Sequence, residues 1–420
     1  MLYFPIGKKP TNDACGSHIR VHGRTGGAQM KSILWILNGC GLEGRGITGG
    51  PVRFNEISRR FGERGMVQHL LTTSGGLEMQ TSLGCEIPAT VVPASFLLKK
   101  EPSRFFRLWS YIVTSLLWRF WKSRIPRTDV IVTVSDYFCD IVPAIALKRK
   151  SGAKWIAWIH HCETDPKTRP GIRLVNEVTA RMQRWSFVRI AHHADAAWIS
   201  DSIAGDEIER RLLALGMPHA RIRRMKDGID VQGVRNAPEP PQKRVDAVMV
   251  GVRPNKGLYD IIPIWERVVA RRPGTTLLLM GGMAGEAQVV EEIKRRGLPI
   301  EVFKPDGGGF LPAALYHAKM KEARILFAPS HEEGWGMAVC EAMASGLPVV
   351  AYDLPAYRQI YSGAYVAVSC FDQDAFADGI VKILDDAKLF KNFRGRGLTA
   401  SANYDWGGIA EEDYEALNHG

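Results

Sequence analysis

The stretch Ala323–Val350, ARILFAPSHEEGWGMAVCEAMASGLPVV, decides the fold of this 420-residue chain. It predicts a strand over Ala323–Pro329, a turn over Ser330–Gly336, a helix over Met337–Ser345 and a second strand from Leu347. Both strands are continuous apolar runs, which is typical of a parallel sheet covered on both faces. A glycine-bounded turn that opens a helix presents free N–H groups and the positive end of the helix dipole. Such a turn can seat a phosphate or a polyhydroxylated ligand.

Two glutamates distinguish this turn from an ordinary strand–turn–helix unit. Glu333 lies in the turn, and Glu341 lies eight residues further on, in the predicted helix. A carboxylate in a ligand-facing turn repels phosphate, so we expect Glu333 to accept hydrogen bonds from hydroxyl groups. A sugar that carries a diphosphate satisfies both halves of such a site. The alternative is structural, with one acid complementing the helix dipole and Glu341 solvated on the helix.

The pattern Glu333-x7-Glu341, with Gly-Trp-Gly-Met inside it and Glu-Ala-Met-Ala-Ser-Gly-Leu-Pro-Val-Val at its end, resembles the signature of family-4-type retaining glycosyltransferases. The resemblance covers most of residues 31–410, densely in the second half and thinly in the first. It implies two Rossmann-like domains that face each other across a cleft, the GT-B architecture. It also implies that Glu333 contacts donor-sugar hydroxyls and Glu341 the ribose. The remaining donor contacts would come from backbone amides of the turn: Gly334, Trp335, Gly336 and Met337.

Length and composition predict a globular protein of two domains. A chain of 420 residues exceeds one ordinary core, and 45% hydrophobic with 24% charged residues is typical of soluble proteins. Seven scattered cysteines without a C-x-x-C pair argue against a disulfide framework or a zinc site: Cys15, Cys40, Cys85, Cys139, Cys162, Cys340 and Cys370. No stretch is apolar enough for long enough to span a bilayer. We expect a cytoplasmic protein, either free or peripheral on the inner face of the cell membrane.

Strands alternate with helices from Lys31 onward, which predicts two parallel, doubly wound α/β sheets. The predicted strands span 33–39, 129–135, 154–160 and 194–200, then 245–252, 275–282, 323–330 and 347–353. The proline-rich segment 236–244 separates the two sets and predicts a linker. The predicted domains are therefore 30–235 and 245–403, with a C-terminal helix over 404–420 that packs back towards the first domain. Residues 1–29 lack periodicity and a signal-peptide centre, so we expect a disordered leader. The alternative is an artefact of start-codon choice, since Met30-Lys31 directly precedes the first predicted strand.

A basic loop, GVRPNKG over Gly251–Gly257, follows the first predicted strand of the second domain. Arg253 can bind two phosphate oxygens as a fork, and Lys256 can bind one as a point charge. We expect both cations to stabilise the charge that grows on a departing nucleoside diphosphate. The loop resembles the family's glycine–arginine…lysine–glycine element, although the family usually places arginine directly after glycine, with a longer spacer. This departure puts Arg253 in more doubt than Lys256, and a solvated basic loop is the alternative.

The first domain contributes a glycine-rich loop and a histidine. The loop Gly44–Gly50, GRGITGG, does not have the spacing of a dinucleotide fingerprint. The resemblance implies that Gly49 and Gly50 line the diphosphate and acceptor side, and a tight turn without a ligand role is the alternative. His160 follows the predicted strand core, and the resemblance implies that it contacts the donor sugar. His161 is the alternate residue for this role, and a surface or packing histidine is the competing interpretation.

The segment Asp372-Gln-Asp374 matches the D-x-D pattern by which other glycosyltransferases hold a divalent cation. Its place just before the amphipathic helix 375–384 favours helix capping instead. We therefore expect neither a metal nor another cofactor, with Lys256, Arg253 and the helix dipole supplying positive charge. The net charge of +11 raises the question of nucleic acid. No zinc-finger, helix-turn-helix or RNA-binding pattern is present, so no nucleic-acid partner is expected.

Residues 103–127, SRFFRLWSYIVTSLLWRFWKSRIPR, combine aromatic and basic side chains to an unusual degree. We expect the polar members to share one helical face: Arg104, Arg107, Thr114, Arg119 and Lys122. Such a helix fits in-plane contact with anionic lipid headgroups. It also fits a core helix of the first domain whose arginines reach solvent.

The sequence thus predicts a hexosyltransferase-type glycosyltransferase that moves a sugar from a nucleoside-diphosphate sugar to a glycan or lipid-linked acceptor, with retention and without metal. Two other classes stay open. One is a nucleotide-sugar epimerase or sugar phosphorylase on the same scaffold, and the other is a non-catalytic protein that binds sugar nucleotides or glycans. The prediction of transfer requires that the acidic pair and the loop around Lys256 converge on one diphosphate-bearing ligand.

Overall fold

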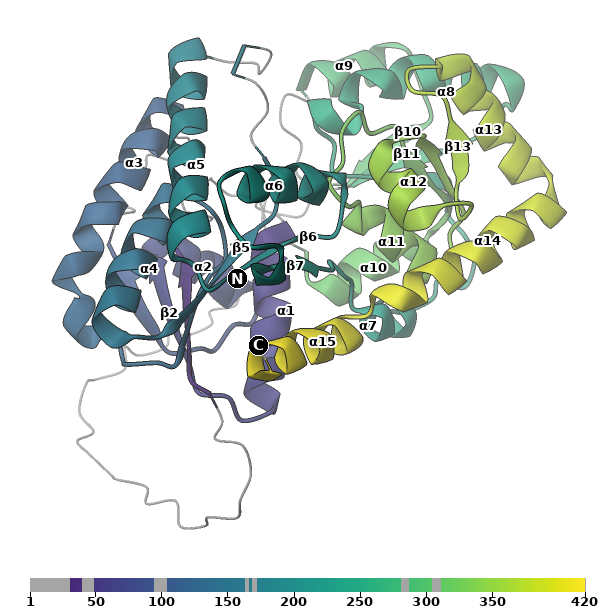
Figure 1. Ribbon diagram of the computed structural model, residues 1–420. Helices are drawn as coiled ribbons and strands as arrows, with labels where there is room; N and C mark the ends of the chain where they lie inside the picture. Colours follow the sequence, from purple (N-terminus) through teal and green to yellow (C-terminus); the bar gives the residue numbers. More distant parts are fainter. Residues whose placement is uncertain are drawn as a thin grey trace, which may run out of the picture. The chain divides into compact units, whose positions relative to one another are not determined.

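The computed structural model describes residues 31–39, 49–93, 104–162, 166–167, 172–280, 287–303 and 311–419. Residues 31–420 form one compact unit. The predicted leader over residues 1–29 and most of the glycine-rich loop fall outside the described residues. The fold therefore rests on the two sheets of that compact unit and on the helices that cover them (Figure 1).

The first sheet has seven parallel strands in the order β3-β2-β1-β4-β5-β6-β7. Its strands are β1 Ile33–Leu37, β2 Gln68–Thr73, β3 Ala89–Val92, β4 Val130–Thr133, β5 Lys154–Ile159, β6 Ala196–Ser200 and β7 Ile222–Met225. The helices of this half are α1 Gly49–Glu63, α2 Ser74–Ser82, α3 Arg104–Leu117, α4 Phe138–Ser151, α5 Arg173–His193 and α6 Ile203–Ala214.

The apolar run of β1 explains why both faces of this sheet are covered. Trp35 packs on one face with side chains of α1, and Leu34 packs on the other with side chains of α4, α5 and α6. Successive strand residues point to opposite faces, so a strand without polar alternation needs helices on both sides.

The second sheet has six parallel strands in the order β10-β9-β8-β11-β12-β13. Its strands are β8 Val245–Val250, β9 Leu277–Met280, β10 Ile300–Phe303, β11 Ala323–Ala328, β12 Val349–Tyr352 and β13 Val366–Val368. The helices after α6 are α7 Val231–Asn236, α8 Ile261–Arg271, α9 Ala287–Arg295, α10 Ala313–Lys321, α11 Met337–Ala344, α12 Pro355–Tyr361, α13 Gln373–Asp385, α14 Ala387–Ser401 and α15 Trp406–His419.

Both sheets are parallel and carry helices on both faces, so the predicted fold class is confirmed. Five observed strands lie outside the predicted ranges: β2, β3, β7, β10 and β13. In β7 the cause is two arginines in a four-residue strand, which hide its apolar character. The Arg223 guanidinium lies over the Trp198 ring, and Arg224 pairs with Glu209. Both charged groups thus find partners outside the strand, while the aliphatic parts of the two side chains stay with the sheet. The domain boundaries and the linker over 236–244 stay predictions.

Helix α15 follows the second sheet in the chain but packs with α1 on the first (Figure 1). Trp406 is buried in the same cluster as Trp35, and the ring centroids of Phe61 and Tyr414 lie 5.7 Å apart. The buried Arg53 guanidinium donates to Asp413 at 2.5 Å. This ion pair therefore anchors the C-terminal helix.

The aromatic basic stretch differs from its prediction. Helix α3 ends at Leu117, and short 3-10 turns follow at Trp118–Phe120 and Lys122–Arg124. Thr114 is fully buried, so it cannot share an outward polar face with Arg119 and Lys122, and that prediction was wrong. The physical reason is that small hydroxyl side chains line the inward side of α3: Ser110, Thr114 and Ser115.

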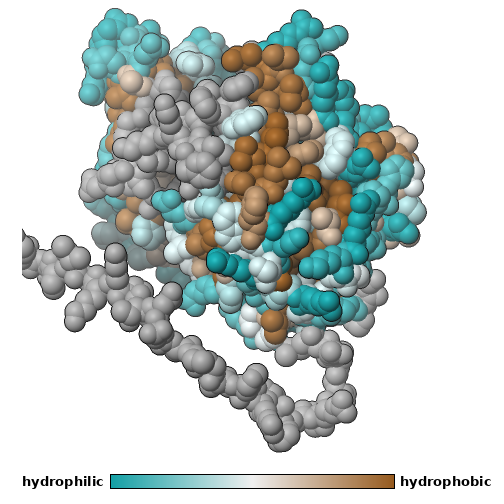
Figure 2. Space-filling model, turned by 90° about the vertical axis from the view of Figure 1, so that its left-hand side faces the viewer, coloured by the Kyte–Doolittle hydropathy of each residue, from teal (hydrophilic) through white to brown (hydrophobic). Residues whose placement is uncertain are grey.

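The outward side of α3 is consequently apolar. Trp109, Leu116 and the neighbouring Phe120 are 51%, 52% and 78% exposed. Figure 2 views the molecule from this side and shows a broad hydrophobic area. Within the described residues, no helix combines the length and apolar character needed to cross a bilayer.

Candidate functional site

Two loops meet at the carboxyl edge of the second sheet, where parallel α/β sheets bind ligands. The loop after β8 carries Lys256, and the turn after the adjacent strand β11 carries Glu333. The Lys256 ammonium lies 2.5 Å from the Glu333 carboxylate oxygen Oε1. The backbone N–H of His331 also donates to the carbonyl oxygen of Asn255 at 3.0 Å. The structure therefore brings together the cationic loop and the first acid of the motif.

Gly257 allows this close approach of the two loops. Its φ of +84° lies in the left-handed region, and a Cβ there would stand 2.1 Å from the carbonyl oxygen of Pro329. Any other residue would push the Lys256 loop away from the end of β11. The helix α8 accordingly begins only at Ile261, after two 3-10 turns.

Glu333 is held by two further donors that the sequence analysis missed. The Ser330 hydroxyl donates to its Oε1 at 3.0 Å, and the Tyr357 hydroxyl donates to the same atom at 3.2 Å. Burial and the nearby Glu333 carboxylate raise the pKa of Tyr357, so its phenol keeps the proton that it donates. All described polar contacts of the Glu333 side chain go to Oε1. The geometry leaves Oε2 available to a ligand hydroxyl.

The turn itself ends where α11 begins. Gly336 has a φ of +90°, and a Cβ there would lie 2.7 Å from the Tyr357 ring. Trp335 is buried, and its ring centroid lies 5.2 Å from that of Tyr404 and 5.7 Å from that of Tyr361. The Trp335 side chain is therefore a core element, and only its backbone remains a candidate for donor contact. Within the described part of the chain, no side chain or backbone atom lies within 4 Å of the Cβ position of Gly334.

Glu341 lies in the second turn of α11 and is oriented by α10. The Tyr316 hydroxyl donates to its Oε2 at 3.0 Å, and the His317 Nε2 lies 3.6 Å from its Oε1. Burial and the Glu341 carboxylate raise the pKa of Tyr316, which keeps this phenol a donor. The sequence showed no sign of either contact, because α10 is distant in the chain and its pattern is ordinary.

Replacing Tyr316 with phenylalanine should weaken donor binding through Glu341. The change removes a hydrogen bond to a charged group, worth roughly 1.5 kcal/mol or more, so the KM for the donor should rise about tenfold. Initial rates against donor concentration measure the effect, and kcat should change little. A KM equal to that of the wild type would show that Tyr316 does not position Glu341.

The Arg253 side chain is held by fewer contacts than that of Lys256. It is exposed and forms no hydrogen bond or ion pair with another described residue. A Cβ built on Gly251 would lie 3.8 Å from its Nη2, so the side chain folds back over its own loop. Arg253 therefore belongs to the same loop as Lys256, but its guanidinium does not contact the Glu333 turn.

On the first sheet, His160 follows β5 at the carboxyl edge. Its Nε2 lies 3.0 Å from the carbonyl oxygen of Val134, and since a carbonyl only accepts, Nε2 carries the proton. Burial, with the positive charge of Arg53 and then His161, lowers the pKa of His160 to about 3. The ring is therefore neutral near pH 7, and its Nδ1 can accept a hydrogen bond. His161 is exposed and does not share this setting.

Gly49 and Gly50 begin α1 close to His160 and Met337. A Cβ built on Gly50 would lie 3.2 Å from the His160 Nε2, and one on Gly49 would lie 3.7 Å from the Met337 sulfur. Met337 opens α11. The first residues of α1 and of α11 are thus near each other, and the ligand roles of both glycines stay predictions.

Replacing His160 with glutamine should flatten the acid dependence of stability. The folded pKa of about 3 lies below the usual 6.5, so the unfolded chain binds a proton that the native state excludes. The contribution of the neutral His160 to the free energy of unfolding is fully present above pH 6.5. It is lost as the pH falls towards 3, by at most about 1.4 kcal/mol per pH unit. Glutamine keeps a donor for Val134 and does not titrate. Urea unfolding near neutrality and at mildly acidic pH tests this, and identical pH slopes in both proteins would contradict it.

The D-x-D segment is occupied by structural contacts. Asp372 is the N-cap of α13, and its Oδ1 accepts from the Ala375 N–H at 2.9 Å, as predicted. Asp374 pairs with Arg271 at 2.7 Å and with Arg267 at 3.2 Å, and these contacts lower its pKa. Neither carboxylate is presented as part of a free pair.

A family model described as "Glycosyl transferases group 1" matches residues 232–398. The chain is 28% identical over 225 residues to a phosphatidyl-myo-inositol mannosyltransferase of Mycobacterium tuberculosis, which covers 50% of this chain and 57% of that protein. It is 26% identical over 227 residues to a GDP-mannose:cellobiosyl-diphosphopolyprenol alpha-mannosyltransferase of Xanthomonas oryzae pv. oryzae. That match covers 51% of this chain and 58% of the relative. The chain thus spans somewhat over half the length of these curated relatives.

Solved structures show the same fold over nearly the whole chain. Anabaena HepE, crystallised in complex with UDP and glucose, superposes with a TM-score of 0.66 at 16% sequence identity. The likeness covers 92% of this chain and 99% of that one. At this identity the comparison shows the fold alone.

Proposed function

We propose that this chain, which has the GT-B fold and belongs through residues 232–398 to the glycosyl transferases group 1 family, transfers a hexosyl group from a nucleoside-diphosphate sugar. The acceptor is a hydroxyl of a glycan or of a lipid-linked glycan, and the anomeric configuration is retained. The observation that carries the proposal is the contact between Lys256 and Glu333 at the carboxyl edge, beside the first turn of α11.

The contact places an ammonium and a carboxylate side by side at the edge where the donor would bind. The diphosphate of the donor would pair with the Lys256 ammonium, and its sugar hydroxyls would donate to the Glu333 carboxylate. The bond between the anomeric carbon and the diphosphate oxygen breaks, and its electron pair stays on the diphosphate. The acceptor oxygen bonds to the anomeric carbon, and its proton passes to the departing diphosphate. Lys256 and the dipole of α11 stabilise the charge that develops.

The other residues complete the proposed site. Glu341, held by Tyr316, accepts from the ribose hydroxyls, and the neutral His160 accepts from a sugar or acceptor hydroxyl through Nδ1. We assign the neutralisation of the diphosphate to Lys256 and the dipole of α11 rather than to a resident metal. The reason is that Asp372 caps α13 and Asp374 forms ion pairs. Closure of the two predicted domains over the cleft would exclude water and protect the donor from hydrolysis.

The names of the relatives support a nucleotide-sugar donor and a lipid-linked acceptor. One relative is named for GDP-mannose and a diphosphopolyprenol, another for a phosphatidyl-myo-inositol, and the superposed structure holds UDP and glucose. We propose a donor and an acceptor of these chemical classes, without choosing a base or a sugar.

A screen of labelled nucleotide sugars tests the proposed reaction against its alternatives. Transfer releases a free nucleoside diphosphate only when an acceptor glycan is supplied. An epimerase would convert the sugar without releasing the nucleotide, and a phosphorylase would require inorganic phosphate. A binding protein would be stabilised against heat by the donor and show no turnover with any acceptor. Any of these three results would replace the proposal.

We also propose that the outward side of α3 contacts an anionic membrane, which would bring the enzyme to a lipid-linked acceptor. Trp109, Leu116 and Phe120 form an exposed apolar surface, and exposed cations follow it directly in the chain: Arg119, Lys122, Arg124 and Arg127. Apolar side chains flanked by cations match the acyl boundary and the charge of anionic headgroups. The absence of any carboxylate from residues 104–127 favours this partner over a cationic one.

Replacing Trp109 and Leu116 with glutamate should reduce recovery with phosphatidylglycerol vesicles in a flotation assay by at least about tenfold, because each change removes apolar contact and adds repulsion. The matched control is Leu213→Glu on α6, which is also exposed. Trp118 is unsuitable for this test because it is buried. Equal flotation of the double variant and the wild type would end the membrane proposal.

A further inference from the structure

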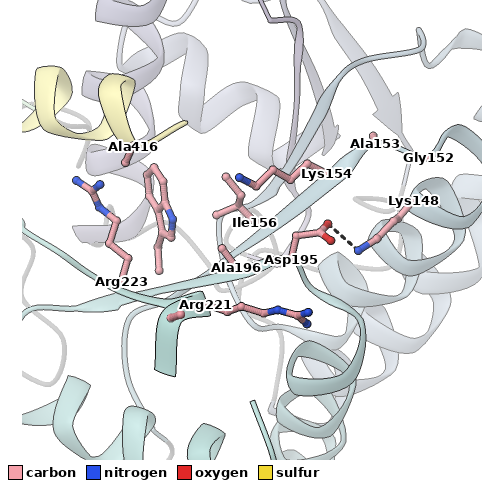
Figure 3. Close-up of a pocket in the computed structure, with 12 residues that line it drawn as sticks. Lys148, Gly152, Ala153, Lys154, Ile156, Asp195, Ala196, Arg221, Arg223 and Ala416 are labelled. Carbon is pink, nitrogen blue, oxygen red and sulfur yellow. Dashed lines mark hydrogen bonds and ion pairs between the residues drawn. The ribbon is translucent and has the colours of Figure 1, made fainter. Parts of the chain in front are cut away.

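A cavity of about 670 Å³ opens at the amino end of the first sheet, away from the carboxyl edge described above. It lies where β5 and β6 begin, next to the segment before β7 and to Ala416 of α15. Figure 3 shows Lys154 and Arg221 on opposite sides of Ala196 in this cavity. Neither the sequence motifs nor the proposed transfer reaction uses any of these residues.

The cavity is strongly cationic. Lys148, Lys154, Arg221 and Arg223 line it together with a single carboxylate, that of Asp195. Asp195 is already engaged, because its Oδ2 accepts from the Lys148 ammonium at 2.6 Å and from the backbone N–H of Trp155 at 2.7 Å. Positive charge therefore exceeds negative charge on the wall.

Two of these cations have no direct polar partner within the described residues. The side chains of Lys154 and Arg221 form no hydrogen bond or ion pair there. Arg223 donates to the Glu412 carbonyl oxygen at 2.8 Å and lies 3.8 Å from Asp413, while its buried Nε has no hydrogen-bond partner among the described residues. Lys154 and Arg223 are partly buried and Arg221 is exposed, so the lining offers positive charge without an equal number of carboxylates. A concave surface lined mainly by one sign of charge attracts ions of the opposite sign.

We infer that this cavity binds a phosphate-bearing anion at a second site, separate from the donor site. Lys154 and Arg221 contribute charged donors from opposite sides of Ala196, and the Arg223 guanidinium adds positive charge to the same lining, in which Ile156 and Ala196 are apolar members. The ligand chemistry is that of a free pyrophosphate-like ion or of a phospholipid headgroup. The inference does not depend on the proposed transferase activity.

The ionisation of Lys154 supports the inference. Burial and the neighbouring charge of Lys31 lower the pKa of Lys154, and Asp195 offsets this only in part. A bound anion would stabilise the charged ammonium by Coulomb attraction and so raise this pKa. Binding should therefore be accompanied by proton uptake at alkaline pH, which calorimetry in buffers of different ionisation enthalpy detects.

Calorimetric titration of the full chain with inorganic pyrophosphate at low salt tests the site. The wild type should show two classes of binding, because the Lys256 loop offers the other. The double variant Lys154→Gln with Arg221→Gln should lose one class, with affinity reduced at least about tenfold, and Lys256→Gln should lose the other. The matched control is Lys388→Gln with Lys391→Gln on α14, which removes two exposed charges elsewhere and should keep both classes.

Vesicle sedimentation distinguishes the two sources of phosphate. Loss of pyrophosphate binding in the double variant, with unchanged binding to phosphatidylglycerol vesicles, assigns the cavity to a free phosphate compound. Loss of vesicle binding alone assigns it to a lipid headgroup. If the correctly folded double variant binds both pyrophosphate and the vesicles as the wild type does, the cavity holds no anion and the inference fails. Circular dichroism confirms the fold of each variant.

Discussion

Replacing Lys256 with glutamine should lower kcat roughly 100- to 1,000-fold, the usual effect of removing one donor that stabilises transition-state charge. Lys256 is the one described cation in contact with Glu333, at 2.5 Å, and its loop cannot be displaced because Gly257 packs against Pro329. The change should cost at most about 1 kcal/mol of folding stability, because the side chain is partly exposed and Glu333 keeps Ser330 and Tyr357.

Two comparisons isolate the charge of Lys256 from its volume and from net charge. Lys256→Arg keeps the cation and should recover part of the rate, while Lys388→Gln removes an exposed charge on α14 and should behave like the wild type. Arg253→Gln should have a smaller effect than Lys256→Gln, since the Arg253 guanidinium has no hydrogen-bond or ion-pair partner among the described residues. Steady-state kinetics with saturating donor give kcat for each variant. A Lys256→Gln enzyme with wild-type kcat would remove the proposed leaving-group stabilisation.

Replacing Glu333 with glutamine should reduce kcat/KM by about 100-fold or more while the protein keeps its fold. The amide can still accept from Ser330 and Tyr357, so the turn should stay in place. It cannot pair with Lys256, and it offers sugar hydroxyls a weaker acceptor than a carboxylate. We expect the loss in kcat as well as in KM, because contacts to the sugar at the reacting carbon strengthen in the transition state.

Glu341→Gln provides the contrast for this experiment. Its proposed contact is to the ribose, which does not react, so its effect should fall mainly on the KM for the donor. Thermal unfolding verifies that both glutamine variants are folded. If Glu333→Gln and Glu341→Gln change kcat and KM in the same proportions, the assignment of one acid to the sugar and the other to the ribose is wrong.

The recognition of a GT-B glycosyltransferase from the Glu333–Glu341 motif is confirmed by the fold and by the family match. The motif was informative because its strands are apolar without alternation and its turn is fixed by glycine. Gly336 has to be a glycine, since its φ is +90° and Tyr357 fills the space where a Cβ would lie. Constraints of this kind act within a few residues, so a sequence displays them.

Contacts between distant segments were not predictable in the same way. Tyr316 reaches Glu341 from 25 positions away, and Tyr357 reaches Glu333 from 24. An isolated tyrosine in an ordinary helix does not indicate which carboxylate it will meet. The buried pair of Arg53 and Asp413, 360 positions apart, went unnoticed for the same reason.

The helix α3 shows a different limit of sequence reasoning. Its composition predicted an amphipathic element, but the orientation of that element depends on which residues fit against neighbouring helices. Small hydroxyl side chains such as Thr114 allow close packing, so they face inward although they are polar. Trp109 and Leu116 are left on the outside of the helix.

The most direct test of the central claim is a thermal-shift titration with nucleoside diphosphates and the matching monophosphates. If Lys256 and Glu333 form the seat of a nucleotide-linked sugar, at least one diphosphate should stabilise the wild type clearly more than its monophosphate. That difference should vanish in Lys256→Gln and persist in Lys388→Gln. Equal stabilisation of the wild type and Lys256→Gln by the same diphosphate would contradict the proposed site.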